Sequence, residues 1–182
     1  MAGTAMKRFS AWAAATLILL TAMPAAGGDK DIEHAGDGVR VALPVLAGGI
    51  SLLRGDEDGL VQFAKSFAVS SALTFGIKKA TNVKRPDGTG NDAFPSGHTA
   101  NAFSAAAYLD HRYGWKYGLP AYMAAGFVGY SRIEADEHDL KDVAAGALLS
   151  WTVSHLFVTP MPISASGEVG PDRALLRVSA QW

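Results

Sequence analysis

Apolar segments of helical length, separated by short polar or proline-containing stretches, constrain this 182-residue chain to a helical fold. Ser96 suits the N-cap of one such segment, and Pro120 suits the first turn of another. The stretch 86–95 concentrates glycine, proline, asparagine and aspartate, and it is therefore expected to be a loop. The spacing of apolar residues predicts helices over residues 59–79, 97–112, 119–132 and 137–157.

The fold class expected from this pattern is all-α, a compact helical bundle with a short C-terminal appendix. In the appendix, Leu176, Val178 and Ala180 alternate with polar residues, which predicts a short β-hairpin. Most charge-free runs are shorter than the roughly 20 residues that a membrane-spanning helix needs, which favours a compact soluble bundle. Five short membrane spans are the alternative.

The N-terminus has the features of a secretory signal peptide. Lys7 and Arg8 precede an apolar stretch at 11–22, and small residues at 25–28 offer a cleavage region. An uncleaved membrane anchor is the alternative, but the apolar stretch is short for a span. We therefore expect a signal peptide at residues 1–26, a helical domain at 27–160 and a tail at 161–182. The mature protein is expected outside the cytoplasm, in the periplasm or at the periplasmic face of a membrane.

Composition excludes several classes of function. The chain has 16 lysines and arginines against 17 aspartates and glutamates, so no overall positive field attracts nucleic acid, and none is expected as a partner. The absence of cysteine excludes disulfides, thiolate nucleophiles and zinc–thiolate sites. Asp87, Asn91 and Asp92 share a glycine-rich loop, but they lack the ligand spacing of an EF-hand calcium loop. The sequence makes no prediction about oligomeric state.

Two histidines are the candidate reactive groups. His138 and Asp142 are four residues apart, which on a helix places them on one face, so that the carboxylate can orient the imidazole for nucleophilic attack. His98 follows Pro95, Ser96 and Gly97 at a predicted helix start, where free N–H groups favour an anion. His98 can there protonate a leaving oxygen. Taken alone, these patterns are more typical of a surface ion pair and an ordinary capped turn.

Three cations close to these histidines in sequence complete a candidate anion site. Arg132 precedes His138 by six residues across a predicted corner, and its guanidinium suits a phosphate group. Lys78 and Arg85 bracket a helix end, and Pro86 stiffens the loop after it. A charge at a helix C-terminus and a solvated basic patch are the alternatives. Taken together, the clusters indicate phosphoryl transfer through a histidine without a metal.

In this order, the residues resemble the motifs of the type 2 phosphatidic acid phosphatase superfamily, called PAP2. The superfamily pattern is K-x6-RP, then PSGH, then SR-x5-H-x3-D, and the chain matches every specified position between residues 78 and 142. The resemblance implies an all-α bundle of the PAP2/haloperoxidase type and an exported bacterial enzyme. The matching residues are Lys78, Arg85, Pro86, Pro95, Ser96, Gly97, His98, Ser131, Arg132, His138 and Asp142.

The resemblance also implies roles for these residues. His138 would be the nucleophile that forms a phosphohistidine, Asp142 its orienting partner, and His98 the general acid and then the base. The phosphoryl oxygens would be held without metal or other cofactor by Lys78, Arg85, Ser96, Gly97 and Arg132.

The implied activity is hydrolysis of a phosphomonoester or diphosphate. A phosphorylated lipid is favoured over a small phosphoester as substrate, with peripheral or integral association with a membrane. One alternative is an enzyme like the vanadium-dependent haloperoxidases, which resemble the same anion site but are usually much longer. The other is a non-catalytic phosphate- or lipid-binding module.

Overall fold

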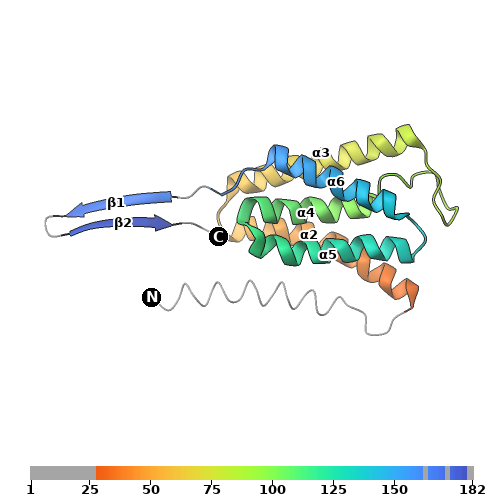
Figure 1. Ribbon diagram of the computed structural model, residues 1–182, viewed down its shortest axis with the longest axis horizontal. Helices are drawn as coiled ribbons and strands as arrows, with labels where there is room; N and C mark the ends of the chain where they lie inside the picture. Colours follow the sequence, from red (N-terminus) through yellow and green to blue (C-terminus); the bar gives the residue numbers. More distant parts are fainter. Residues whose placement is uncertain (1–27, 162–163, 171–172, 180–182) are drawn as a thin grey trace.

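The chain folds into a helical bundle, as predicted from the apolar pattern. Figure 1 shows the computed structural model, which describes residues 28–161, 164–170 and 173–179. The signal peptide expected at residues 1–26 lies outside this described part. The helices of the described part are α2 (Asp29–Leu53), α3 (Glu57–Thr81), α4 (Gly97–Tyr113), α5 (Trp115–Glu134) and α6 (Leu140–Phe157).

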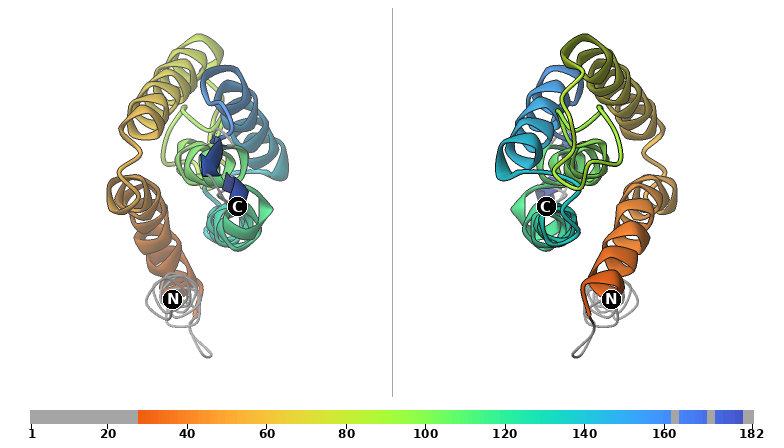
Figure 2. Two further views of the ribbon diagram at one scale, coloured as in Figure 1. Left: turned by 90° about the vertical axis from the view of Figure 1, so that its left-hand side faces the viewer. Right: turned by 90° about the vertical axis from the view of Figure 1, so that its right-hand side faces the viewer.

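Helix α4 forms the centre of the bundle and contacts all four other helices. Figure 2 shows α4 between α2 and α3 on one side and α5 and α6 on the other. The central position follows from the composition of α4, because small side chains let neighbouring helices approach closely. Five of its alanines are fully buried: Ala100, Ala102, Ala105, Ala106 and Ala107.

Helix α3 begins at Glu57, two residues before the predicted start, and two other helix starts differ by three or four residues. Helix α5 begins at Trp115, four residues before the predicted start, and Pro120 lies inside it. Helix α6 begins at Leu140 rather than at residue 137. It begins there because the Asp142 carboxylate accepts a hydrogen bond from the backbone N–H of Asp139, at 3.0 Å, and caps the first turn.

The C-terminal tail forms the expected hairpin. Strands β1 (Ser164–Gly170) and β2 (Arg173–Ser179) pair antiparallel, with Ser164 opposite Ser179 and Gly170 opposite Arg173. In Figure 1 the two strands project from one end of the bundle.

A buried ion pair closes the end of the bundle from which the hairpin projects. The Asp56 carboxylate, in the corner between α2 and α3, lies 2.6 Å from Nη2 and 2.8 Å from Nε of Arg112, and both side chains are about 4% exposed. The Tyr113 hydroxyl donates to the same carboxylate at 2.9 Å, and the N–H of Gly59 donates at 3.0 Å. This network joins the corner to the last turn of α4.

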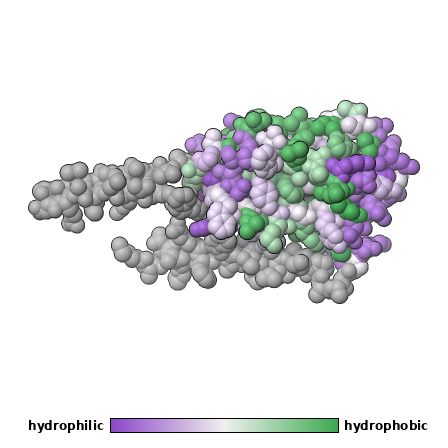
Figure 3. All heavy atoms as spheres, in the orientation of Figure 1, coloured by the Kyte–Doolittle hydropathy of each residue, from purple (hydrophilic) through white to green (hydrophobic). Residues whose placement is uncertain are grey.

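The outer faces of the helices are rich in apolar side chains. Helices α2 and α3 are also long and apolar enough to cross a membrane, by length and composition. In Figure 3 apolar residues spread over the flank of the bundle, hydrophilic residues gather at the end opposite the hairpin, and a further hydrophilic group lies near the hairpin. The exposed large apolar residues include Val41, Val45, Leu52, Leu53, Val61, Leu73, Phe75, Leu119, Met123, Trp151, Leu156 and Phe157.

Candidate active site

The residues singled out from the sequence come from four helices and two of the connections between them, which meet at the hydrophilic end of the bundle (Figure 1). Helices α3 and α5 end there, whereas α2, α4 and α6 begin there. The N-termini of three helices therefore lie next to the C-terminal turns of the other two. Lys78 lies in the last turn of α3, Arg85 in the following loop, Ser96, Gly97 and His98 at the start of α4, Arg132 at the end of α5, His138 in the turn before α6, and Asp142 in the first turn of α6.

His138 lies in the tight turn between α5 and α6, not on α6 as the sequence reasoning assumed. Its backbone N–H donates to the carbonyl of Arg132 at 3.2 Å, which folds the turn back on α5. The pairing with Asp142 nevertheless forms, because Asp142 lies in the first turn of α6. Nδ1 of His138 is 3.7 Å from Oδ2 of Asp142, and both side chains are buried.

The His138–Asp142 pair is within ion-pair distance but beyond hydrogen-bond distance. Nδ1 of His138 and Oδ1 of Asp142 have no hydrogen-bond partner among the described residues. A shift of less than 1 Å would join Nδ1 to the carboxylate, since such a bond needs about 2.7–3.2 Å. The other ring nitrogen, Nε2, is then the one available for attack.

Burial lowers the pKa of His138, and the positive charges of Lys78 and Arg85 lower it further. The carboxylates of Asp142 and Glu137 raise the pKa and oppose this effect. The net lowering keeps the imidazole neutral near pH 7, and a neutral imidazole is the nucleophilic form.

The start of α4 is fixed by Ser96. Its Oγ accepts hydrogen bonds from the backbone N–H and the hydroxyl of Thr99, at 3.4 and 3.0 Å, so Ser96 is the N-cap that the sequence predicted. Its own N–H donates to the carbonyl of Asp142 at 2.9 Å and ties α4 to α6. Gly97 lies beside Lys78, whose Cε is 3.6 Å from the position that a Cβ on Gly97 would take.

His98 extends from the first turn of α4 toward α2. Its Nε2 lies 3.1 Å from Oδ1 of Asp37. Burial, together with the charges of Arg40 and Arg132, lowers the pKa of His98 to about 4, although Asp37 acts in the opposite direction. In the absence of a bound anion the imidazole is therefore neutral at pH 7. A phosphate dianion would raise this pKa, because negative charge favours the protonated form.

Arg132 is 1% exposed and is held from three directions. Its Nη2 donates to the carbonyl of Glu33 at 2.6 Å. Its Nη1 lies 3.4 Å from Oδ1 of Asp37 and 3.4 Å from Oε2 of Glu137. These contacts fix the orientation of the guanidinium plane and of its N–H donors. A guanidinium with a fixed orientation suits recognition of a phosphoryl group.

Gly36 allows α2 to come this close to α5. A Cβ at this position would lie 2.0 Å from Oγ of Ser131 and 3.3 Å from Nη2 of Arg132, so any larger residue would collide with the site. A glycine at position 36 is therefore what allows α2 to pack close enough to contact Arg132.

Asp92 holds the other two cations. Its carboxylate accepts two hydrogen bonds from Arg85, at 2.7 and 3.2 Å, and its carbonyl accepts one from Nζ of Lys78. The remaining terminal nitrogen of Arg85, Nη1, lies 3.7 Å from Oε2 of Glu137. The loop residue Asp92 thus orients both cations toward the interior of the site.

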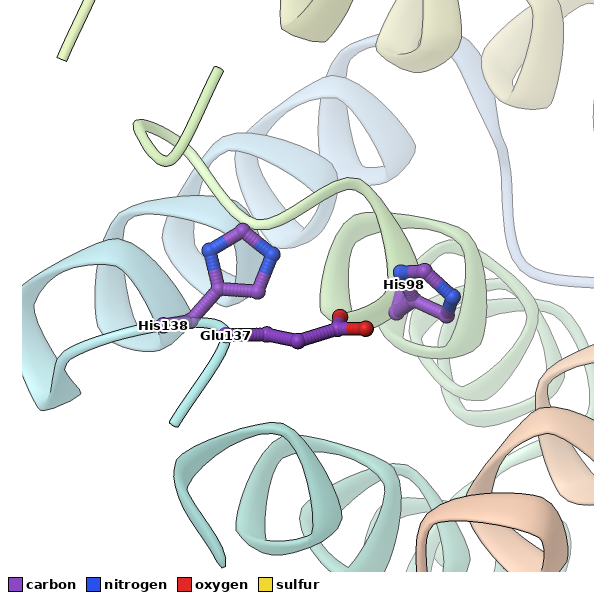
Figure 4. Close-up of side chains that lie close together, drawn as sticks. All are labelled: His98, Glu137 and His138. Carbon is purple, nitrogen blue, oxygen red and sulfur yellow. The ribbon is translucent and has the colours of Figure 1, made fainter. Parts of the chain in front are cut away.

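A carboxylate lies between the two histidines. One ligand atom each of His98, Glu137 and His138 lies within 4.8 Å of the others, and Figure 4 shows the Glu137 side chain extending between the two rings. Three such groups could hold a metal ion. The guanidinium groups of Arg85 and Arg132 stand beside the cluster, however, and their charge opposes a cation and favours an anion.

Residues 59–163 match the model of the family described as the PAP2 superfamily, with the motifs of the candidate site inside the matched segment. The chain belongs to the PAP2 superfamily. It is 33% identical to the lipid A 4'-phosphatase of Helicobacter pylori strain J99, over 77% of this chain and 76% of that protein. It is 36% identical to the lipid A 1-phosphatase of Porphyromonas gingivalis, over 53% of this chain but only 22% of that protein.

The fold of this PAP2 chain has a counterpart among solved structures. The crystal structure of Aquifex aeolicus LpxE superposes with a TM-score of 0.52, and the match covers 66% of this chain and 83% of that one. The sequence identity is 24%, so the similarity concerns the fold.

Helix α2 of this PAP2 chain lies outside the matched segment, yet it supplies groups that contact the site. Asp37 pairs with His98 and Arg132, and Arg40 lies close enough to affect the charge of His98. Sequence reasoning missed both residues. A signal was present, because residues 33, 37 and 40 are spaced by three or four and share one face of a helix.

Proposed function

We propose that this chain is a phosphatase that hydrolyses a lipid-linked phosphomonoester or diphosphate through a phosphohistidine at His138. Its membership of the PAP2 superfamily supports hydrolysis of a phosphoric ester. One observation carries the proposal. A buried His138 and a half-buried His98, both neutral in the free protein, converge on a space that is bordered by Arg85 and Arg132 and already contains a carboxylate. That space suits an anionic group placed between a nucleophile and a proton donor.

In the first step Nε2 of His138 attacks phosphorus, and the bond from phosphorus to the leaving oxygen breaks. His98, protonated under the influence of the bound dianion, gives its proton to the leaving oxygen. Asp142 lies at Nδ1 and stabilises the positive charge that develops on the His138 ring. In the second step His98 takes a proton from water, the water oxygen attacks phosphorus, and the phosphorus–nitrogen bond breaks to release phosphate.

Positive charge from side chains takes the role that a metal has in many phosphatases. Lys78, Arg85 and Arg132 would neutralise the phosphoryl oxygens, and the hydrogen-bond acceptors that orient these cations are already in place. Ser96 and Gly97 would contribute at the N-terminus of α4, where backbone N–H groups and the helix dipole favour an anion. The hydroxyl of Ser96 accepts bonds from Thr99, which leaves its proton to donate.

A lipid substrate is supported by two independent observations. Curated relatives of this chain are lipid A 4'- and 1-phosphatases. The outer faces of the bundle also carry large exposed apolar side chains, and hydrophilic residues gather at the end that holds the candidate site. We therefore propose membrane association with this end at the lipid headgroups, and an exported location. The proposed domain limits are a signal peptide at 1–26, the phosphatase domain at 27–160 and a tail at 161–182.

A phosphate-release assay tests this function. Purified protein, dialysed exhaustively against EDTA, is expected to release inorganic phosphate from lipid A or phosphatidate in mixed micelles, at the same rate as undialysed protein. Mass spectrometry of the lipid identifies the position that is cleaved, and His138→Ala prepared in parallel measures any contaminating phosphatase. No release from either lipid or from p-nitrophenyl phosphate would refute the proposal. Loss of activity after dialysis, with recovery on adding a divalent ion, would refute its metal-free form.

The pH dependence should report the two histidines. In the free protein His98 must be protonated and has a pKa of about 4, whereas His138 must be neutral and has a pKa below its usual 6.5. We expect kcat/KM to be highest between pH 4 and pH 6.5 and to fall as the pH rises further. Bound phosphate raises the pKa of both groups, so the alkaline limb of kcat should lie at higher pH. Identical alkaline limbs for kcat and kcat/KM would contradict this scheme.

A further inference from the structure

Glu137 occupies the position that the proposed function assigns to the phosphoryl group. Its Oε2 lies 3.4 Å from Nη1 of Arg132 and 3.7 Å from Nη1 of Arg85, so one carboxylate bridges the two guanidinium groups. The same carboxylate lies within 4.8 Å of a ring nitrogen of His98 and of His138 (Figure 4). Its side chain is 17% exposed, so it points into the site rather than into solvent.

The other acidic residues of the turn do not reach these arginines. Asp139 pairs with Lys141 at 2.8 Å, with both side chains more than half exposed, and Glu134 is exposed at the end of α5. Among the acidic residues of this turn, Glu137 is therefore the one that forms ion pairs with the two arginines; their other carboxylate partners, Asp37 and Asp92, come from α2 and from the loop before α4.

The two arginines keep other partners if Glu137 moves away. Arg132 also contacts Asp37 and the carbonyl of Glu33, and Arg85 is held by two hydrogen bonds from Asp92. Those groups would continue to orient the guanidinium groups in the absence of Glu137. Glu137 lies before α6 begins, so rotation about its side-chain bonds is enough to remove the carboxylate without unwinding the helix.

A phosphate group and the Glu137 carboxylate repel each other when they share this space. Like charges about 4 Å apart repel strongly at the effective dielectric typical near a protein surface. The carboxylate and the phosphoryl group are therefore alternatives at the two arginines, and they do not bind there together.

We propose that Glu137 is a built-in competitor for the phosphoryl group, which sets the affinity of the site for phosphate. In the free protein it neutralises Arg85 and Arg132; entry of the substrate phosphate displaces it, and its return assists release of the inorganic phosphate product. This inference rests on the proposed function for its biological meaning, but the competition itself is a property of anion binding.

Glu137→Gln tests the proposal because it keeps the shape of the side chain and removes its charge. Isothermal titration with inorganic phosphate is expected to show about tenfold tighter binding to this variant, because phosphate no longer has to displace a charged carboxylate from the two guanidinium groups. The inhibition constant of phosphate in the release assay should fall by the same factor. Glu134→Gln, which removes the same charge from the same turn, is the matched control and should change binding by less than about twofold.

Several outcomes would overturn the proposal. Glu137→Gln and Glu137→Ala that bind phosphate no more tightly than the wild type, or more weakly, would show that Glu137 does not compete. Zn²⁺ binding by the wild type that is lost in Glu137→Gln, with phosphate affinity unchanged, would assign the cluster of His98, Glu137 and His138 to a cation instead. Thermal melting of each variant identifies a folding defect, and a defect in both variants would give Glu137 a structural role in place of the proposed one.

The test also separates this inference from the proposed function. Tighter phosphate binding in Glu137→Gln, in a protein that releases no phosphate from any substrate, would support the competition and refute the phosphatase. Turnover by the wild type, with equal phosphate affinity in the wild type and Glu137→Gln, would support the phosphatase and refute the competition.

Discussion

Replacing His138 with alanine is expected to lower kcat by about four orders of magnitude or more, because it removes the atom that would form the covalent bond to phosphorus. The side chain is buried and close to Asp142, and the charges of Lys78 and Arg85 favour its neutral form. Water cannot take its place readily, since the phosphoryl group would then lack a nucleophile held in line. Steady-state phosphate release measures the change.

His98→Ala should behave differently, and the leaving group reveals the difference. With a lipid alcohol as leaving group, loss of the general acid should cost about 10²–10⁴ in rate. With p-nitrophenyl phosphate as substrate, the leaving p-nitrophenolate needs no proton, so the rate of the first step in His98→Ala should be largely preserved. The second step, attack by water, should remain slow because it lacks its general base. The phosphohistidine should then accumulate. Radiolabelled phosphate bound to His98→Ala, stable to base and released by acid, would identify it.

The control for the histidine variants is His34→Ala, because His34 is exposed on α2 and has no role in the proposed site. It should retain the activity of the wild type. Undiminished turnover in His138→Ala, or covalent label in a protein that lacks His138, would refute the nucleophile assignment.

The helices were predictable from sequence because apolar spacing and capping residues act locally. Ser96 caps α4 as expected, and the predicted segment 59–79 lies within α3. Pro120 misled the prediction for α5, because proline favours the first turn of a helix. Here it is the sixth residue of α5, where it removes one intrahelical hydrogen bond without ending the helix. For α6, the carboxylate of Asp142 moves the start from the predicted residue 137 to Leu140, because it accepts the backbone N–H of the N-cap residue Asp139.

The candidate site was predictable in its motif residues but not in their partners. The motif residues meet at one end of the bundle, as the resemblance of their order to the PAP2 motifs implied: Lys78, Arg85, His98, Arg132 and His138. The contacts of Asp37 and Glu33 depend on how α2 packs against α5, a long-range arrangement that no local pattern specifies. The position of Glu137 depends in the same way on the turn, where Asp136 adopts a φ of 53°.

Removing the positive charge of Arg112 is expected to destabilise the fold by about 3–5 kcal/mol, because it leaves the Asp56 carboxylate buried without a counter-charge. Two hydrogen bonds of 2.6 and 2.8 Å join the pair, and Arg112 also donates to the carbonyl of Thr159 at 2.9 Å. The pair thus connects the α2–α3 corner, the end of α4 and the chain after α6. Chemical denaturation of Arg112→Ala and wild type measures the loss, and Lys116→Ala, an exposed cation near the α4–α5 corner, should change stability by about 0.5 kcal/mol or less.

The same pair should make the free energy of unfolding depend on pH in the acid range. Arg112 lowers the pKa of Asp56 to about 2 from an ordinary 3.8. A carboxyl group with a depressed pKa stabilises the folded state above its unfolded pKa, so a contribution of about 2 kcal/mol should be present above pH 4 and lost as the pH falls toward 2. Arg112→Ala should lack this loss, since the unpaired Asp56 has no depressed pKa.

The double variant Asp56→Ala, Arg112→Ala should be no less stable than Arg112→Ala alone, because it removes the buried charge as well. A double variant whose loss equals the sum of both single losses would show that the two side chains act independently.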